Sequence, residues 1–367
     1  AAGFIFASFF IFAPLANAAT FIPAGDVTIT TNITWTKVES PYVIQGSRLT
    51  IAPGVKLTIE PGVVVKLSQP LFWHLFIISG ELNALGTAAD KIYFTSLQDD
   101  SVGGDTNGDG DATLPASGDW RLIAFNPSSM GNLSHVVIRY AWDSGYNSGV
   151  VNEGDQINFS NVQITKSKGS AIRQRSGSLV ITVSEINNNE TGIWFEGGAT
   201  NISQSSIHDN SQYGIFNIVT TQVNAENNWW GGASGPFHPT LNPAGAGNAV
   251  SNNVDFIPWL GFDPLHDTPP PDPVIIIPGI LGSSDKNGVW VIDPIFHTYD
   301  DLIATMKANG YTEGADLFTF PYDWRQSNVI TAVQLRDKIN EVQNVCQCAK
   351  VDLVAHSMVG LVARQYI

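Results

Sequence analysis

The chain has 367 residues, enough for two or three domains that each bury a core. Lys and Arg number 18 against 33 Asp and Glu, and the net charge of −15 argues against nucleic-acid binding, since a phosphate backbone attracts a basic face. With 34 Gly, 20 Pro and only 14% charged residues, the composition favours turn-rich β structure over a helical bundle.

Residues 1–19 are apolar and small and have the character of a secretory signal peptide. Phe and Ile are frequent in positions 4–12, and Ala16-Asn17-Ala18 follows as an A-x-A cleavage site. No Lys or Arg precedes Lys37, so the charged n-region of a signal peptide is missing. The apolar run is short for a membrane span, which needs about 20 residues. We predict a secreted or cell-surface protein with no transmembrane span; a buried strand of the mature protein is the alternative.

Residues 20–263 consist of short β-rich runs broken by Gly, Asn, Ser and Asp, with a regular repeat. Two sets of Ile recur every 21 or 22 residues: Ile164, Ile186 and Ile207, and then Ile172, Ile193 and Ile215. Self-similarity at this period indicates stacked structural units. A leucine-rich repeat needs a Leu scaffold, whereas this region is rich in Ile, Val, Asn and Ser. We therefore predict an all-β, right-handed parallel β-helix over residues 20–263.

The repeat stops at Trp229 and Trp230, where Gly, Pro and Asn become frequent. We interpret these two side chains as the cap that covers the last turn of the β-helix. Stacking against a sugar is the alternative role, and it would suit a β-helix that binds a polysaccharide or another surface ligand.

One excursion from the repeat carries oxygen ligands at alternate positions: Asp105, Asn107, Asp109 and Asp111. This spacing, with Gly at the turn, resembles the first half of a Ca²⁺ loop. The twelfth position is Ala116, where a bidentate Glu is expected in a complete loop. The incomplete spacing leaves two alternatives open, a polar loop without metal and a Ca²⁺ site, and no cofactor is required.

Residues 264–273 form a Pro-rich linker, and the pattern then changes to alternating strands and helices. The predicted strands are Val274–Ile277, Leu317–Phe320 and Val351–Val354, and the predicted helices are Asp300–Asn309 and Val329–Val345. In the second helix we expect Val333, Leu335, Ile339 and Val342 to face inward. Residues 274–367 are therefore predicted to be the N-terminal part of an α/β domain.

Two short spacings in this region are interpreted as structural. Cys346 and Cys348 have one residue between them, which would strain a mutual disulfide, so we predict free thiols. Asp323 and Arg325 would lie on one face of a strand, as an ion pair beneath the site.

The segment around Ser357 has the outline of a nucleophile elbow, a strand–turn–helix that presents a catalytic Ser. Its hydroxyl would be the nucleophile, and the N–H of Met358 would bind the oxyanion that forms during attack. The elbow demands small residues on both sides of the Ser. Ala355 meets this demand, but Val359 stands where Gly is usual, and its branched side chain would crowd the turn.

A second oxyanion donor should come from the loop that follows the first strand. Residues Pro278–Gly282 contain two glycines, which let the backbone approach a substrate closely. We predict that the N–H of Ile280 is this donor. An ordinary turn at a strand end is the alternative.

Four segments in this order resemble the lecithin:cholesterol acyltransferase-like lipases: Pro273–Ser283 (Pro-Val-Ile-Ile-Ile-Pro-Gly-Ile-Leu-Gly-Ser), Asn309–Tyr311, Phe320–Arg325 (Phe-Pro-Tyr-Asp-Trp-Arg) and Ala355–Ser357. The resemblance implies an α/β-hydrolase that cleaves or transfers acyl groups of lipid esters. It also implies that Ser357 is the nucleophile, with Ile280 and Met358 as oxyanion donors. In that family the catalytic Asp and His follow the Ser, so we expect neither within residues 1–367, and we do not assign His356 as the base.

Together these features predict a secreted serine-nucleophile lipid esterase or acyltransferase with a β-helix binding domain, inactive as residues 1–367 because acid and base are absent. A non-catalytic surface-binding or adhesion protein with a degenerate hydrolase domain is the alternative, and Val359 favours it. A third reading makes the β-helix a polysaccharide-active enzyme, although the sequence shows no repeating Asp pair on successive turns.

Overall fold

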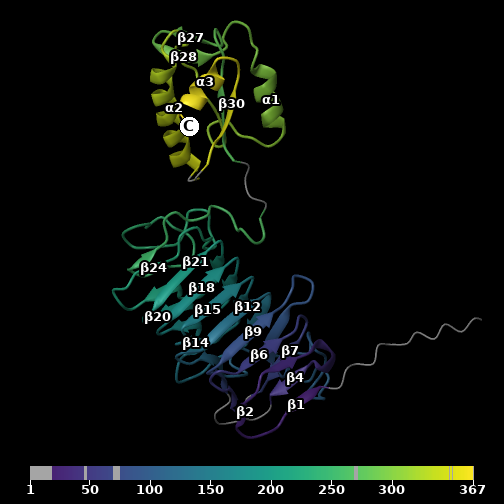
Figure 1. Cartoon of the computed structure of the whole chain (residues 1–367). Coiled ribbons are helices and arrows are strands. Elements are labelled where there is room, and N and C mark those ends of the chain that lie inside the picture. Colours follow the sequence, from purple (N-terminus) through teal and green to yellow (C-terminus); the bar gives the residue numbers. More distant parts are fainter. Residues whose placement is uncertain are drawn as a thin grey trace, which may run out of the picture. The chain divides into compact units, whose positions relative to one another are not determined.

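The computed structural model describes residues 19–44, 48–68, 75–267, 272–346, 348 and 350–366. The chain divides into two compact units, Ala1–Asp267 and Thr268–Ile367 (Figure 1). The predicted signal peptide up to Ala18 and residues 268–271 of the predicted linker lie outside the described residues. None of the helices in the described part combines the length and apolar character that a membrane crossing requires.

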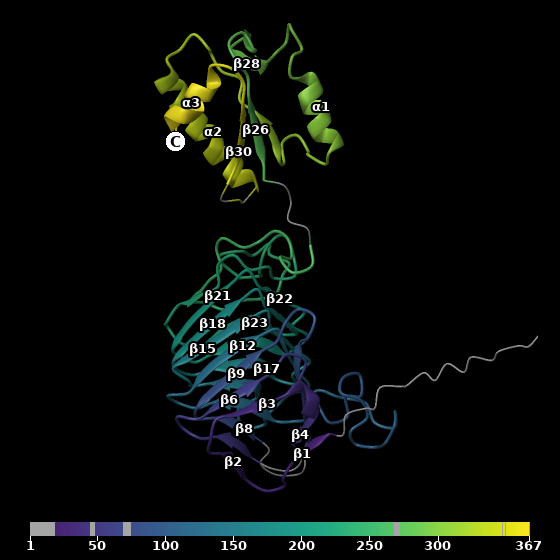
Figure 2. The same cartoon turned by 45° about the vertical axis from the view of Figure 1, so that its right-hand side comes forward.

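The first unit is a β-solenoid of about eight turns in its described residues, built from three parallel sheets (Figure 2). The first sheet has the order β1 (Thr20–Ile22), β4 (Tyr42–Ile44), β7 (Val64–Leu67), β10 (Ile92–Ser96), β13 (Val136–Arg139), β16 (Gln163–Thr165), β19 (Glu185–Asn187) and β22 (Ser206–His208). The second has β2 (Val27–Ile29), β5 (Leu49–Ile51), β8 (Leu75–Ile78), β11 (Leu122–Phe125), β14 (Ser148–Asn152), β17 (Ser170–Gln174), β20 (Thr191–Phe195) and β23 (Tyr213–Asn217).

The third sheet has β3 (Ile33–Trp35), β6 (Lys56–Ile59), β9 (Glu81–Leu85), β12 (Met130–Ser134), β15 (Gln156–Ser160), β18 (Ser178–Thr182), β21 (Ala199–Ser203), β24 (Val223–Asn224) and β25 (Val254–Asp255). A short 3₁₀ helix, η1 (Lys37–Glu39), interrupts an early turn of the solenoid. Each turn gives one strand to each sheet, and every strand pairs in parallel with the corresponding strand of the next turn.

The Ile repeat is the inner wall of this solenoid. Ile164 pairs with Ile186, and Ile186 pairs with Ile207, in the first sheet. The second Ile set stacks in the same way in the second sheet, and all six side chains are at most 1% exposed. Burying one such side chain stabilises the fold by about 1.5–3 kcal/mol. The sequence period therefore equals one turn, and the predicted parallel β-helix is confirmed.

Asn side chains satisfy the backbone at one corner of the turns. The Oδ1 of Asn210 accepts the N–H of Asn189 at 3.1 Å, while its Nδ2 donates to the Oδ1 of Asn248 at 2.9 Å. These Asn residues stack from turn to turn because a buried amide group without a partner would be costly. Asn189 and Asn210 are 21 positions apart, like successive Ile residues, whereas Asn248 follows Asn210 after 38 positions.

The pair of Trp residues lies in the segment that pairs with the last strand of the first sheet. Trp230 is fully buried in the core of the solenoid, whereas Trp229 is partly exposed. Backbone hydrogen bonds join Trp229 to Ser205 at 2.9 Å and to Ile207 at 2.8 Å, so this segment continues the wall of the preceding turn. Trp230 thus belongs to the core of the solenoid, while the capping role of the pair and sugar stacking at Trp229 stay predictions.

The second unit contains a parallel sheet with the order β29 (Leu317–Thr319), β26 (Val274–Ile277) and β30 (Asp352–Ala355). Its helices are α1 (Asp300–Ala308), α2 (Asn328–Cys346) and α3 (Val359–Tyr366), and β27 (Ser283–Lys286) and β28 (Val289–Ile292) form a hairpin. The central strand β26 is buried on both faces, as its continuous apolar run predicts. Ile275 and Ile277 pack with residues of α2 and α3, whereas Val274 and Ile276 pack with residues of α1.

Two predictions in this unit are wrong. Val333 is 47% exposed, and Ala332 takes its place on the inner face of α2, because positions 332, 335, 339 and 342 follow the helical period.

The second wrong prediction is that of free thiols, because Cys346 and Cys348 form a disulfide. Helix α2 ends at Cys346, and the two Cα atoms lie 5.1 Å apart, within the usual range for a disulfide.

Candidate active site

Ser357 lies on a tight turn between a strand and a helix. Strand β30 ends at Ala355, and α3 begins at Val359. The φ angle of Ser357 is +64°, a left-handed conformation that is uncommon for a residue other than Gly. The residue is also exposed. A strained, exposed Ser at a strand-to-helix turn is the geometry of a nucleophile elbow.

Val359 does not crowd this turn in the way its branched side chain suggested. It is fully buried and belongs to the same apolar cluster as Ile277 and Val362. The left-handed backbone conformation lies at Ser357 and not at Val359. The side chain at 359 therefore anchors the start of α3 to the core.

The loop that follows β26 lies directly against this turn. Strands β26 and β30 are parallel neighbours, so their carboxyl ends meet at the same edge of the sheet. A Cβ atom added to Gly279 would lie 2.9 Å from the Cβ of Ser357 and 3.1 Å from the carbonyl oxygen of His356. Only Gly permits this close approach.

Two amide groups near Ser357 are available as donors. Within residues 272–346, 348 and 350–366, neither the N–H of Ile280 nor that of Met358 has a hydrogen-bond acceptor. The loop is closed by a bond from the N–H of Gly282 to the carbonyl of Gly279 at 2.9 Å. An oxyanion is stabilised by N–H donors of this kind when they lie close to the attacking hydroxyl.

His356 does not act on the neighbouring hydroxyl. Its Nδ1 lies 2.8 Å from the hydroxyl of Tyr299, and the two rings meet edge to face. Among the described residues no hydrogen bond joins the side chain of Ser357 to any base. His356 is therefore bonded to Tyr299, and the Ser357 hydroxyl has no bonded base among these residues.

Asp323 and Arg325 form the expected ion pair, but in the loop after β29 and not on a strand. The Nε and Nη2 of Arg325 donate to the two carboxylate oxygens of Asp323 at 2.7 and 3.1 Å. This hydrogen bonding by Arg325 lowers the pKa of the Asp323 carboxyl. The guanidinium also lies over the rings of Trp290 and Trp324, so the pair holds this loop together.

Comparison with known proteins finds a family for part of the second unit. Residues 290–367 match the family model for lecithin:cholesterol acyltransferase. Residues 290–367 form a lecithin:cholesterol acyltransferase-like (LCAT-like) domain. The protein named lecithin-cholesterol acyltransferase-like 4 from Arabidopsis thaliana is 28% identical over 124 residues. The alignment covers 30% of this chain and only 22% of that relative. No solved structure matches the chain.

The matched segment of the LCAT-like domain contains Ser357, Met358 and the Phe320–Arg325 string. The loop that carries Ile280 precedes it, and the structure rather than the family match brings this loop to Ser357. Sequence reasoning missed Tyr299, which bonds to His356 although 57 positions separate them.

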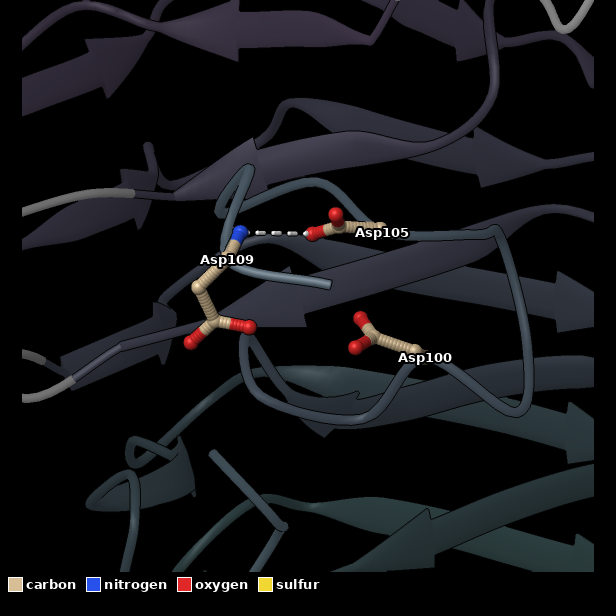
Figure 3. A group of neighbouring side chains, drawn as sticks. All are labelled: Asp100, Asp105 and Asp109. Atoms are coloured by element: carbon tan, nitrogen blue, oxygen red, sulfur yellow. Dashed lines mark hydrogen bonds between the residues drawn. The ribbon is translucent and has the colours of Figure 1, made fainter. Parts of the chain in front are cut away.

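The predicted Ca²⁺ loop contains a group of converging carboxylates in the first unit. Oxygens of Asp100, Asp105 and Asp109 lie within 4.8 Å of one another, and Figure 3 shows the first two pointing toward a common space. Asp105 also accepts the N–H groups of Gly108 and Gly110. Asp111 is exposed and lies outside this group.

Several oxygens of this loop are shielded from water without a hydrogen bond. Among the described residues these are the Oδ1 atoms of Asp100, Asn107 and Asp109 and the Oγ1 of Thr106. The buried ammonium of Lys66 lies 3.8 Å from Asp100 and offsets part of the charge. Asn107 and Asp109 also line a pocket of about 510 Å³. Three carboxylates against one ammonium leave an excess of negative charge, and the Ca²⁺ site stays a prediction.

Calcium should raise the melting temperature of the chain if the carboxylate group binds it. A site with a Kd of about 10⁻⁴–10⁻³ M would add about 1.4–2.7 kcal/mol at 10 mM Ca²⁺. Asp109→Asn should abolish the shift, whereas Asp111→Asn should keep most of it. Calorimetric scans with Ca²⁺ and with a chelator test this, and an unchanged melting temperature in the unsubstituted chain would contradict the site.

The contact at Gly279 predicts opposite effects for two Gly→Ala changes. Gly279→Ala should destabilise the second unit by about 1–3 kcal/mol, because the added methyl group would meet Ser357 and the backbone carbonyl of His356. Gly360→Ala should stabilise it by about 0.5–1 kcal/mol, since the position lies in α3 with open space around it. Urea denaturation of both variants measures this, and equal effects would refute the contact.

Proposed function

We propose that the LCAT-like domain has an α/β-hydrolase fold and transfers acyl groups from lipid esters through Ser357. One observation carries the proposal: Ser357 is exposed, has a φ of +64° and lies between β30 and α3, and within the described residues the amides of Ile280 and Met358 have no acceptor. The match to the acyltransferase family supplies the class of reaction.

In the proposed reaction the hydroxyl of Ser357 attacks the carbonyl carbon of the ester while a base removes its proton. The carbonyl oxygen becomes an oxyanion, which the N–H groups of Ile280 and Met358 hold. When the tetrahedral intermediate collapses, the alcohol leaves with a proton and an acyl-enzyme remains. Water or another alcohol then takes the acyl group from Ser357, which gives an esterase or an acyltransferase.

The surroundings of the site favour an apolar substrate. The side chains of Ile280 and Leu281 are 50% and 54% exposed, on the loop that touches the elbow. An acyl chain lying on them would cover apolar surface that is otherwise in contact with water. This supports an ester with an apolar acyl group as the substrate class.

Among the described residues no base is hydrogen-bonded to Ser357. We therefore expect residues 1–367 alone to be inactive and a His with an Asp elsewhere to complete the triad. The solenoid would bind a polysaccharide or another surface ligand. The Cys346–Cys348 disulfide supports a secreted or cell-surface location, because disulfides persist in oxidising compartments.

The rival proposal is an adhesion protein with a degenerate hydrolase domain. It rested on Val359, which was expected to distort the elbow. Since Val359 packs into the core beneath α3 and Ser357 keeps the left-handed turn, this residue does not favour the rival.

The test is ester hydrolysis by the longest natural form of the protein that contains residues 1–367. Ser357→Ala should reduce hydrolysis of a p-nitrophenyl ester by at least about 10³-fold, because the nucleophile is lost. Asp323→Asn, which weakens only the ion pair with Arg325, should retain most of the rate. Unchanged hydrolysis in Ser357→Ala would refute the proposed function. Ser357-dependent turnover by residues 1–367 alone would refute the expectation that the base lies outside these residues.

A further inference from the structure

Tyr299 connects the two segments that carry the proposed oxyanion donors. Its side chain is 6% exposed and lies at the start of α1. The hydroxyl accepts the N–H of Gly279 at 2.8 Å and lies 2.8 Å from the Nδ1 of His356. Gly279 immediately precedes Ile280, and His356 immediately precedes Ser357. One hydroxyl group is thus bonded to both sides of the site.

The hydrogen-bond directions follow from the available donors. The oxygen of Tyr299 already accepts the N–H of Gly279, so its own hydrogen points to the unprotonated Nδ1 of His356. His356 then carries its proton on Nε2. If Nδ1 were protonated instead, the buried hydroxyl hydrogen of Tyr299 would lose this acceptor.

The backbone of Tyr299 is held by Asp293, which is itself bonded to the loop from Gly279 to Gly282. The carboxylate of Asp293 accepts the N–H of Tyr299 at 3.2 Å, and it also accepts the N–H of Thr298. The N–H of Asp293 in turn donates to the carbonyl of Gly282 at 2.8 Å. The loop from Gly279 to Gly282 is therefore tied to Tyr299 at both ends.

We propose that Tyr299 is a positioning residue that sets the separation of the Ile280 and Met358 amides at the oxyanion site. This proposal rests on the proposed function. Removing the hydroxyl leaves the buried N–H of Gly279 without an acceptor and releases the His356 ring. The loop can then shift away from the turn, and a displacement of about 1 Å at a reacting centre costs up to about 100-fold in rate.

The chain offers a matched control in Tyr322. This side chain is 2% exposed, in the apolar cluster that also contains Val359. Within the described part of the chain its hydroxyl is buried and has no hydrogen-bond partner. Tyr322→Phe and Tyr299→Phe therefore remove the same atom from two buried Tyr residues, but only Tyr299→Phe removes hydrogen bonds.

The kinetic test uses the longest natural form of the protein and a soluble short-chain ester. Tyr299→Phe should lower kcat by about 10–100-fold with KM within about twofold, because the hydroxyl acts on the oxyanion and not on substrate binding. Tyr322→Phe should leave both constants unchanged. If Ser357→Ala abolishes turnover but Tyr299→Phe does not slow it, the positioning role is refuted and the proposed function stands. If Ser357→Ala keeps its activity, the proposed function itself fails.

A second measurement uses the unsubstituted chain, so its result does not depend on whether any variant folds. In residues 1–367 with ¹⁵N-labelled His, the His356 resonances should show an unprotonated Nδ1 and a protonated Nε2. A protonated Nδ1 in the unsubstituted chain would overturn the proposed network. Where Tyr299→Phe folds, loss of this tautomer preference should accompany the fall in kcat.

Discussion

The approach of Gly279 to Ser357 is the constraint on which the proposed site depends. Two loops can meet there because β26 and β30 are parallel neighbours whose carboxyl ends share one edge of the sheet. The contact leaves no room for a Cβ atom at 279, and the turn at 357 needs a left-handed backbone. A flatter elbow or a bulkier loop residue would separate the hydroxyl from the amide of Ile280.

The two units obtain their stability in different ways. The solenoid repeats one arrangement, in which Ile side chains stack inward and Asn side chains close the corners. A change in one turn is therefore felt mainly by its neighbours. The second unit instead packs the buried strand β26 between helices on two faces, so the position of its site depends on the whole core.

Much of this architecture could be predicted from the sequence, because the relevant signals are periodic or local. The spacing of Ile164, Ile186 and Ile207 equals one turn, and the run before Ser357 is a strand followed by small residues. The family resemblance was likewise borne out by the match over residues 290–367.

The parts that escaped prediction depend on tertiary packing. Tyr299 meets His356 only because α1 packs on one face of β26 and brings its first residue to the sheet edge. Asp100 precedes the predicted Ca²⁺ loop and joins Asp105 only through the turn between them. The β27–β28 hairpin has a two-residue turn, Asn287-Gly288, with positive φ at both positions. This Asn-Gly pair is a strong local signal, so the hairpin, unlike these contacts, could have been predicted from the sequence.

Covalent labelling with a fluorophosphonate tests the central claim most directly, because the reagent reacts with an activated Ser and mimics the tetrahedral intermediate. The account predicts that, in the longest natural form of the protein, mass spectrometry finds the phosphonyl group on Ser357, and that prior heat denaturation prevents the reaction. A label on another residue, or no label on the folded protein, would contradict it.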